Sequence, residues 1–287
     1  MGAAQSIEDQ PVHKYEILTL NDGTKVGYLM YNSFTAGTSA DPEKYNDKLR
    51  EVSTKFKEAN VKATILDLRY NAGGSLDCVQ LLATILVPSA RMGTPMAYLE
   101  YNDKNIDKST TIDFDQEVLK TGTNLNQNVL IVITSGTTAG AAEMLLTSLY
   151  KKDQYPNIIV MGSASKGQTV ATEQFINETY RWSVNPVVCT VYNSDHVAGE
   201  EPFILTPSDQ FKISETSIDG TTNYSQFLPF GDPKERMLSI AIQTLEGTYP
   251  PKDEDKEEET PSTKSFKIEK NVSSPASRRF AGGLRIK

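Results

Sequence analysis

Residues Val129 to Tyr150 read VLIVITSGTTAGAAEMLLTSLY, and this stretch decides the fold. It opens with an apolar, β-branched run, Val129 to Ile133, which has the length of a buried strand. Small polar residues follow at 135–138, a composition typical of a tight turn, and after Ala139 the apolar positions recur at helical spacing. The stretch therefore predicts a strand, a sharp turn and a helix. Glu143 falls in the first turn of that helix, where a carboxylate suits the helix dipole.

A corner of this kind has chemical consequences. The backbone N–H groups at the start of a helix point outward and can hold an anion or an oxyanion. Many acyl-transfer enzymes place a nucleophilic Ser, Thr or Cys at such a strand-to-helix turn. The residue at the expected position here is Gly140, which has no side chain. This absence governs the interpretation of function.

Composition places the chain among globular proteins with a core of ordinary size. It has 287 residues, of which 38% are apolar and 23% charged. The net charge of −8 and the pI of about 5.0 argue against nucleic acid as a partner. No apolar run approaches the roughly 20 residues that cross a bilayer. Residues 1–14 lack a basic stretch followed by an apolar one, so no signal peptide is visible.

The histidines and cysteines narrow the chemistry further. His13 and His196 have no carboxylate or thiol at metal-ligand spacing, which argues against a zinc site and against a Ser-His-Asp triad. We expect no metal and no cofactor. Cys78 and Cys189 are far apart in the sequence and each has apolar neighbours, so we predict buried free thiols rather than a disulfide.

The rest of the chain alternates between strand and helix patterns. Apolar runs at 15–20 and 26–31 flank Asn21-Asp22-Gly23, which predicts a hairpin. Asp41-Pro42 predicts the start of an amphipathic helix with Asp41 as its N-cap. The other predicted elements are strands at 63–68, 158–161, 170–176 and 187–192, helices that begin at 76 and at Asp232-Pro233, and polar excursions at 89–128 and 193–226. Strands that alternate with helices in this way imply a layered α/β core.

Composition also divides the chain into a flexible leader at 1–14, a core domain at 15–247 and a C-terminal extension at 248–287. Residues 252–260 include six acidic side chains and cannot pack a core. Residues 262–287 carry seven Lys or Arg against one Glu, a net charge of +6, which leaves −14 on the rest of the chain. We favour a disordered, solvated tail. The alternative is a tail that docks on the chain's own acidic core or on a partner.

Three segments carry a family signature in the right order and spacing. They are DLRYNAGG at 67–74, TAGAAE at 138–143 and the loop GSASKG at 162–167. Together with 26–34 and 228–233 they resemble the tail-specific, or C-terminal processing, serine proteases, in the version common in Bacteroidetes-type bacteria. The resemblance covers roughly residues 15 to 246, and D-L-R-x-N-x-G-G is its specific part.

The resemblance implies a ClpP/crotonase-like fold and a Ser–Lys dyad that cuts polypeptides. Gly140 falls on the nucleophile, where a Ser is expected, and Lys166 matches the dyad lysine with a one-residue insertion. The family glutamine four residues after the lysine is Val170 here, and Gln168 is the only Gln nearby.

The resemblance also assigns residues around the dyad. The backbone N–H groups of the oxyanion hole would come from Gly73, Gly74 and Ala141. Asp67, Arg69 and Asn71 belong to the same signature, and an ion pair between Asp67 and Arg69 at the strand end has a structural rather than a catalytic interpretation.

The missing hydroxyl decides between three functional hypotheses. A lysine is a general base only when neutral, which requires burial to lower its pKa from about 10.4, and it then needs a hydroxyl to deprotonate. We therefore predict a domain that binds extended polypeptide and cleaves it poorly or not at all. The alternatives are an active peptidase that recruits Ser135, Thr137, Thr138 or the S-x-x-K string ending at Lys166, and a non-enzymatic scaffold.

The resemblance carries further expectations about context. Relatives act outside the cytoplasm of bacteria and usually carry a PDZ domain, for which the residues before the first strand are too few. We therefore expect an excised fragment or a minimal member of the family. The substrate, the oligomeric state and the role of the tail stay open.

Overall fold

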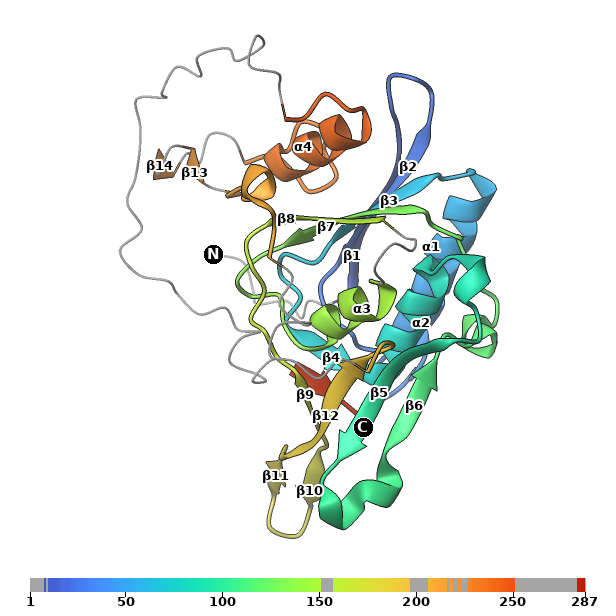
Figure 1. Cartoon of the computed structure of the whole chain (residues 1–287), viewed down its shortest axis with the longest axis vertical. Helices are drawn as coiled ribbons and strands as arrows, with labels where there is room; N and C mark the ends of the chain where they lie inside the picture. The colour runs from blue at the N-terminus through green and yellow to red at the C-terminus, as the bar shows by residue number, and fades with distance from the viewer. Residues whose placement is uncertain are drawn as a thin grey trace.

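The computed structural model describes residues 8, 10–150, 157–196, 206–215, 217–218, 221–222, 227–250 and 283–286. Within these residues, four α-helices and two larger sheets form a mixed α/β structure (Figure 1). The predicted α/β class is confirmed. Residues 1–7 and 9 of the predicted leader and most of the C-terminal extension lie outside the described residues. The predicted leader is too long at its C-terminal end, because residues 12–14 already belong to the strand Val12–Thr19.

The first sheet has the strand order β1-β2-β3-β7-β8. Its strands are β1 (Val12–Thr19), β2 (Lys25–Tyr31), β3 (Ala63–Asp67), β7 (Val129–Thr134) and β8 (Asn157–Gly162). The first two form the predicted antiparallel hairpin, and β2, β3, β7 and β8 run parallel to one another. The carboxyl ends of β3, β7 and β8 therefore lie at one edge of the sheet. The three signature segments follow these ends, and this edge brings them together.

Helices cover both faces of this sheet (Figure 1). On one face, Leu66 and Val132 pack in a cluster with α1 (Lys44–Glu58), α2 (Leu76–Leu86) and α3 (Ala141–Leu149). On the other face, Ile65 and Ile131 pack with α4 (Arg236–Leu245). Because successive side chains of a strand point to opposite faces, neighbouring residues of β3 and β7 enter different cores. Both faces are buried, which explains the continuous apolar runs in the sequence.

The second sheet has the order β4-β15-β9-β12-β5-β6. Its strands are β4 (Gly73–Ser75), β15 (Gly283–Arg285), β9 (Val170–Thr172), β12 (Val187–Asn193), β5 (Pro95–Tyr101) and β6 (Thr110–Asp113). Strand β15, close to the end of the chain, lies between β4 and β9 and runs parallel to both. For these residues the structure shows the alternative that we did not favour, a tail docked on the chain's own core.

Two segments differ from their prediction: one that was predicted to be irregular contains strands, and one that was predicted to be a single strand contains parts of two. Residues 89–128, predicted as an irregular excursion, supply β5 and β6 to the second sheet. The predicted strand at 170–176 divides into β9 and β10 (Phe175–Asn177), because β10 leaves the sheet to pair with β11 (Trp182–Val184). The remaining short elements are β13 (Ser217–Ile218), β14 (Thr221–Thr222) and 3-10 turns at Ser89–Arg91, Asp103–Lys108, Gln116–Leu119 and Asp209–Phe211.

The two Asp-Pro pairs, which were predicted to begin helices, lie a few residues before the helices that follow them. The N-cap of α1 is Glu43 rather than Asp41, and the N-cap of α4 is Glu235, whose carboxylate accepts the N–H of Leu238 at 2.9 Å. Each Asp-Pro pair forms a turn instead: the carbonyl of Asp232, for example, accepts the N–H of Glu235 at 2.8 Å. The Asp-Pro signal therefore marks the turn that leads into the helix.

Two expectations from composition can be compared with the described residues. Cys78 and Cys189 are buried free thiols, as predicted. In the part of the chain that the structure covers, no helix has both the length and the apolar character needed to cross a bilayer.

Candidate active site

Asn71 joins three segments at the carboxyl edge of the first sheet. It is fully buried, and its side-chain Nδ2 donates to the carbonyl of Tyr31 at 2.8 Å. Its Oδ1 accepts the N–H of Gly73 at 2.9 Å, and its own carbonyl accepts the N–H of Ala139 at 3.1 Å. The side-chain amide and the main-chain carbonyl of this one residue thus fix the hairpin, the glycine pair and the turn before α3 relative to each other.

Positions 73 and 74 require glycine because the main chain of other segments lies too close to them to leave room for a side chain. Their φ angles are +113° and +142°, which disfavour any side chain. A Cβ on Gly73 would overlap Gly283, and a Cβ on Gly74 would overlap the carbonyl of Phe34. The Gly73 N–H already donates to Asn71. Of the three predicted oxyanion donors, this leaves the amides of Gly74 and Ala141.

Gly140 is the corner residue between β7 and α3. It is the N-cap of α3, with φ +55° and ψ −104°, and Ala141 is the first helical residue. A left-handed corner of this type carries strain for any residue other than glycine. The N–H of Ala141 is in the first turn, where helical amides have no partner within the helix. The predicted strand, turn and helix are confirmed, with the helix starting two residues later than Ala139.

The hydroxyls that precede the corner bond to the main chain. Thr138 is fully buried and its Oγ1 donates to the carbonyl of Leu68 at 2.8 Å. Thr137 Oγ1 donates to the carbonyl of Arg69 at 2.7 Å, and Ser135 Oγ donates to the same carbonyl. These bonds fasten the turn to the end of β3. They give all three hydroxyls a structural role.

Glu143 connects the corner to the loop that carries Lys166. Its side chain is fully buried, and its carboxylate accepts three backbone N–H groups. These donors are Gly140 at 2.8 Å, Gly167 at 2.5 Å and Gln168 at 2.9 Å. Sequence reasoning found only the favourable dipole position of Glu143. The available signal was its spacing, three residues after the corner, which is the spacing of a capping box.

Lys166 reaches the corner through its backbone. Its N–H donates to the carbonyl of Thr138 at 3.0 Å, and its side chain is exposed, whereas a neutral general base requires burial. Gln168 lies two residues further on, with its side chain against the main chain of Gly283: a Cβ on Gly283 would meet Gln168 Nε2 at 2.6 Å. The structure therefore brings the Lys166 loop, the Gly140 corner and the glycine pair to one place.

Arg69 forms a buried ion network beside this place. Its guanidinium contacts Asp67 at 2.8 Å, Glu215 at 2.9 Å and Glu235 at 3.0 Å. Burial by itself lowers the pKa of Arg69, but the charge of Asp67 and the hydrogen bonds to Glu235 and Asp67 raise the pKa overall. Asp67 and Arg69 thus form the predicted ion pair, and Arg69 additionally joins β3 to the N-terminus of α4.

Two tyrosines complete the network. Tyr28 donates its hydroxyl to Asp67 at 2.9 Å, and its pKa is raised by burial first and by the Asp67 charge second. Tyr70 donates to Glu215 at 2.8 Å, and burial and the Glu215 charge raise its pKa. Both hydroxyls therefore stay protonated and donate. The network supplies a rigid support for the strand end.

The C-terminal strand β15 crosses this site, drawn in red beside β4 and β9 in Figure 1. The Gly283 N–H donates to the carbonyl of Ala72 at 2.9 Å, and the Ile286 N–H donates to the carbonyl of Thr172 at 2.9 Å. Leu284 is buried. Charge alone pointed to a tail that docks on the core. The pairing with β4 and β9 has no local sequence signal, because both strands are more than a hundred residues away along the chain.

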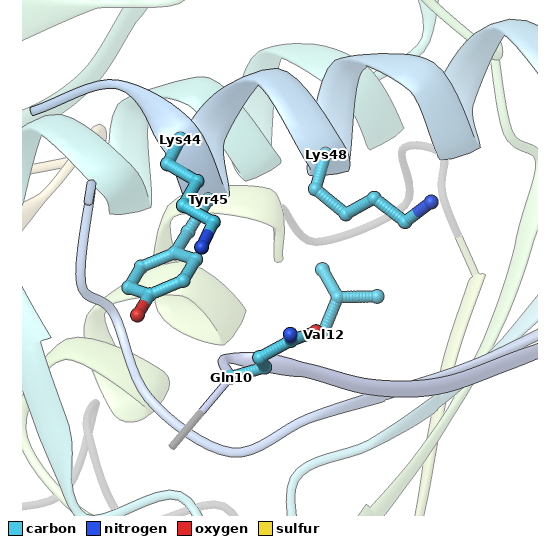
Figure 2. A pocket seen from close by; sticks show the side chains of 5 residues that line it. All are labelled: Gln10, Val12, Lys44, Tyr45 and Lys48. Carbon is cyan, nitrogen blue, oxygen red and sulfur yellow. The ribbon is translucent and has the colours of Figure 1, made fainter. Parts of the chain in front are cut away.

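A separate pocket of about 270 Å³ lies between the N-terminal strand and α1. Figure 2 shows its lining residues: Gln10, Val12, Lys44, Tyr45 and Lys48. None of them belongs to the glycine pair, the Gly140 corner or the Lys166 loop. Among the residues that the structure describes, no three His, Cys, Asp or Glu side chains gather as a metal site.

Comparisons with known proteins agree with this arrangement. A crystal structure of a candidate S41 protease from Bacteroides fragilis NCTC 9343 is 39% identical, with a TM-score of 0.77, and the match covers 86% of this chain and 60% of that one. The photosystem II D1 C-terminal processing protease is 18% identical with a TM-score of 0.51, covering 73% and 50% respectively, which shows a shared fold. This chain therefore spans 60% or less of the length of both structures. No curated protein sequence matches it.

The family model of peptidase family S41 matches residues 25–200, which is more than half of the chain. The match includes the glycine pair, the Gly140 corner and the Lys166 loop. The chain belongs to peptidase family S41.

Proposed function

We propose that this S41 domain binds extended polypeptide and that its hydrolysis of the peptide bond is impaired. The observation that carries the proposal is Gly140 at the N-cap of α3, with φ +55° and no side chain. A serine peptidase needs a hydroxyl here that a base can deprotonate. Without it, an active site retains only the weak catalysis that comes from binding and the oxyanion hole.

The backbone parts of the site support peptide binding. Gly74 and Ala141 supply the amides that would face a carbonyl oxygen, and the facing edges of β4 and β9, which hold β15 between them, are able to pair with a strand. Lys166 is proposed as the residue of the dyad, and Gln168 as a neighbour that contacts the bound peptide rather than the base. None of these groups needs the missing hydroxyl to hold a polypeptide.

A substitute nucleophile is disfavoured by the hydrogen bonds at the corner. Thr137 and Thr138 donate to the carbonyls of Arg69 and Leu68, so an attack by either would require the turn to be rebuilt. The S-x-x-K string that ends at Lys166 follows a strand and does not open a helix, unlike the serine of penicillin-binding proteins.

The family resemblance also supports a bacterial location outside the cytoplasm, which cell fractionation would test.

Gain of function tests the proposal. Wild-type protein and Gly140→Ser are incubated with unfolded casein, and fragments are measured by mass spectrometry. We expect no turnover from wild type and clear turnover from Gly140→Ser, despite a backbone strain of about 1–3 kcal/mol for a side chain at this corner. Lys166→Ala in the Gly140→Ser background should abolish the gain, because the base is removed.

Gly136→Ser is the matched control. It introduces the same hydroxyl four residues upstream, where a Cβ would meet nothing within 4 Å. We expect it to be as inactive as wild type. Turnover by wild-type protein that survives Lys166→Ala would contradict the proposal.

A further inference from the structure

We propose that the chain's own C-terminal segment, Gly283–Ile286, is the resident ligand of the peptide cleft. We further propose that the cleft selects polypeptides with a glycine opposite Gly140 followed by a large aliphatic residue. This inference rests on the proposed polypeptide-binding function and gives it a ligand class. The segment acts as a built-in competitor that other polypeptides must displace.

Main-chain hydrogen bonds hold the segment from both sides. The Gly283 N–H donates to Ala72 on the β4 side, and the Ile286 N–H donates to Thr172 on the β9 side, both at 2.9 Å. Strand addition of this kind obtains affinity from the backbone and specificity from pockets for alternate side chains. The cleft therefore binds a strand of the class that it is proposed to recognise.

Gly140 faces the peptide bond between Gly283 and Leu284. A Cβ built on Gly140 would overlap the carbonyl carbon and Cα of Gly283 and would lie 2.5 Å from the nitrogen of Leu284. In a parallel ladder, the N–H and C=O of one residue bond to the residues on either side of its partner. Because Gly283 pairs with Gly73 and donates to Ala72, its carbonyl faces the amide of Gly74.

The segment thus lies where a scissile bond would lie, with its carbonyl directed to a predicted oxyanion donor. Gly140 has two effects here. It removes the nucleophile, and it removes the one side chain that would prevent the strand from lying this close. The substitution that impairs catalysis is the one that permits stable occupation.

Side-chain contacts define the selected sequence. Any Cβ at position 283 would meet Gln168 Nε2 at 2.6 Å and the amide carbon of Gln168 at 3.2 Å, so glycine fits as the site stands and a larger residue requires the end of the Gln168 side chain to move. Leu284 is buried with only 2% of its surface exposed, in the core cluster that includes α2 and α3. A polar residue at this position would enter that core without a partner.

Charge favours binding of the tail to its own core. Residues 262–287 carry a net charge of +6, and the rest of the chain carries −14. Attraction between unlike charges raises the local concentration of the tail near the acidic core. The covalent link acts in the same direction, because it makes binding intramolecular.

Hydrogen exchange of the full-length protein tests the occupation directly. We expect the amides of Gly283 and Ile286 to exchange at least about 100-fold more slowly than in a free peptide of residues 280–287. Gly140→Ala should accelerate both amides by about tenfold or more, because its Cβ overlaps Gly283. Exchange at the free-peptide rate in wild type would overturn the inference.

Two alanine controls separate contact from general perturbation. Gly93 has φ +75°, Gly136 lies outside the left-handed φ region, and a Cβ at either position would meet nothing within 4 Å. Gly93→Ala reproduces the backbone strain without the contact, and Gly136→Ala has neither. Both should leave the two amides protected, and equal acceleration in all three variants would count against the inference.

Binding in trans separates this inference from the proposed function. The probe is a fluorescent peptide of residues 280–287, added to wild type and to full-length Leu284→Asp and Gly283→Val, whose own tails are displaced. We expect both variants to bind the probe at least about tenfold more tightly than wild type, because no internal competitor remains. A probe with valine at the position of Gly283 should bind at least about tenfold more weakly.

Failure of the resident-ligand inference and failure of the proposed polypeptide binding would give different experimental results. Unprotected amides together with equal probe binding by wild type and variants would overturn the resident ligand and leave polypeptide binding intact. Protected amides in wild type together with no probe binding by either variant would support the internal strand and overturn polypeptide binding as the function.

Discussion

Gly140 combines two features that a side chain would oppose, the first by backbone strain and the second by overlap. It adopts a corner with φ +55°, and it lets the main chain of Gly283 approach within van der Waals overlap of where a Cβ would be. Neither property requires chemistry from the residue. At this scale the proposed site is a cleft for polypeptide, in which the amides of Gly74 and Ala141 would surround a position that has no side-chain hydroxyl.

Glu143 provides the first prediction at the scale of single residues. Glu143→Gln keeps the shape but can offer only one oxygen to three backbone donors, so at least one buried N–H loses its acceptor. We expect a loss of about 1–3 kcal/mol in the free energy of unfolding. Urea denaturation measures it, with Glu58→Gln on the exposed end of α1 as control, for which we expect no measurable loss.

The same substitution has a functional readout. In the Gly140→Ser background, Glu143→Gln should lower kcat because the corner and the Lys166 loop are no longer held together by one carboxylate. Unchanged stability and unchanged kcat would show that Glu143 does not connect these segments.

At the scale of elements, Arg69 determines how β3 and α4 meet. Its guanidinium lies between Asp67 at the end of β3 and Glu235 at the N-cap of α4, and all three side chains are buried. Glu235 caps the helix and binds Arg69 with the same carboxylate. Helix α3 is fixed similarly: Glu143 accepts amides at its N-terminus, and Arg91 donates to the carbonyls of Ser148 and Leu149 at its C-terminus.

Arg69→Met tests the ion network. It leaves buried carboxylates without a counter-charge, so we expect a loss of about 3–5 kcal/mol in the free energy of unfolding. Lys48→Met is the control, because its pair with Glu51 is exposed and should be worth at most about 1 kcal/mol. Equal effects of the two substitutions in thermal or urea unfolding would contradict the structural role of Arg69.

The elements also show what sequence can and cannot predict. The hairpin of β1 and β2, the strands β3, β7 and β8 and the Gly140 corner follow from local apolar period and turn chemistry, and the structure has them. Strand β6 was missed because a polar edge segment has no strong local pattern, and β5 was missed because its short apolar run lies within a polar stretch. Strand β15 was missed because its partners are distant in the sequence, and Glu143 was undervalued because two of its three donors come from a loop more than twenty residues away.

At the scale of the whole molecule, two cores enclose the first sheet, and both cysteines are buried. Burial raises the pKa of Cys78 to about 12 and that of Cys189 to about 11. The thiols of an unfolded chain ionise near pH 8.5. Below that pH the thiols are protonated in both the folded and the unfolded protein, and their full contribution to the free energy of unfolding is present. Between about pH 8.5 and 11 only the unfolded state ionises, so stability falls as pH rises.

This linkage predicts alkaline destabilisation of about 1–2 kcal/mol per buried thiol by pH 10. Urea unfolding of wild type at pH 8 and pH 10 measures the loss. The double variant Cys78→Ala, Cys189→Ala should lose less stability over the same interval, whatever the cavities cost at pH 8. An identical pH dependence in the two proteins would contradict the role of the thiols.

We propose a complete polypeptide cleft that lacks one oxygen and holds the C-terminal segment of its own chain. The measurement that tests this most directly is the cleavage of a quenched fluorescent peptide of residues 280–287 by Leu284→Asp and by Gly140→Ser, Leu284→Asp. We predict that only the protein with serine at position 140 cuts the peptide, between the glycine and leucine that match Gly283 and Leu284. Equal cleavage by both proteins, or none by either, would contradict the account.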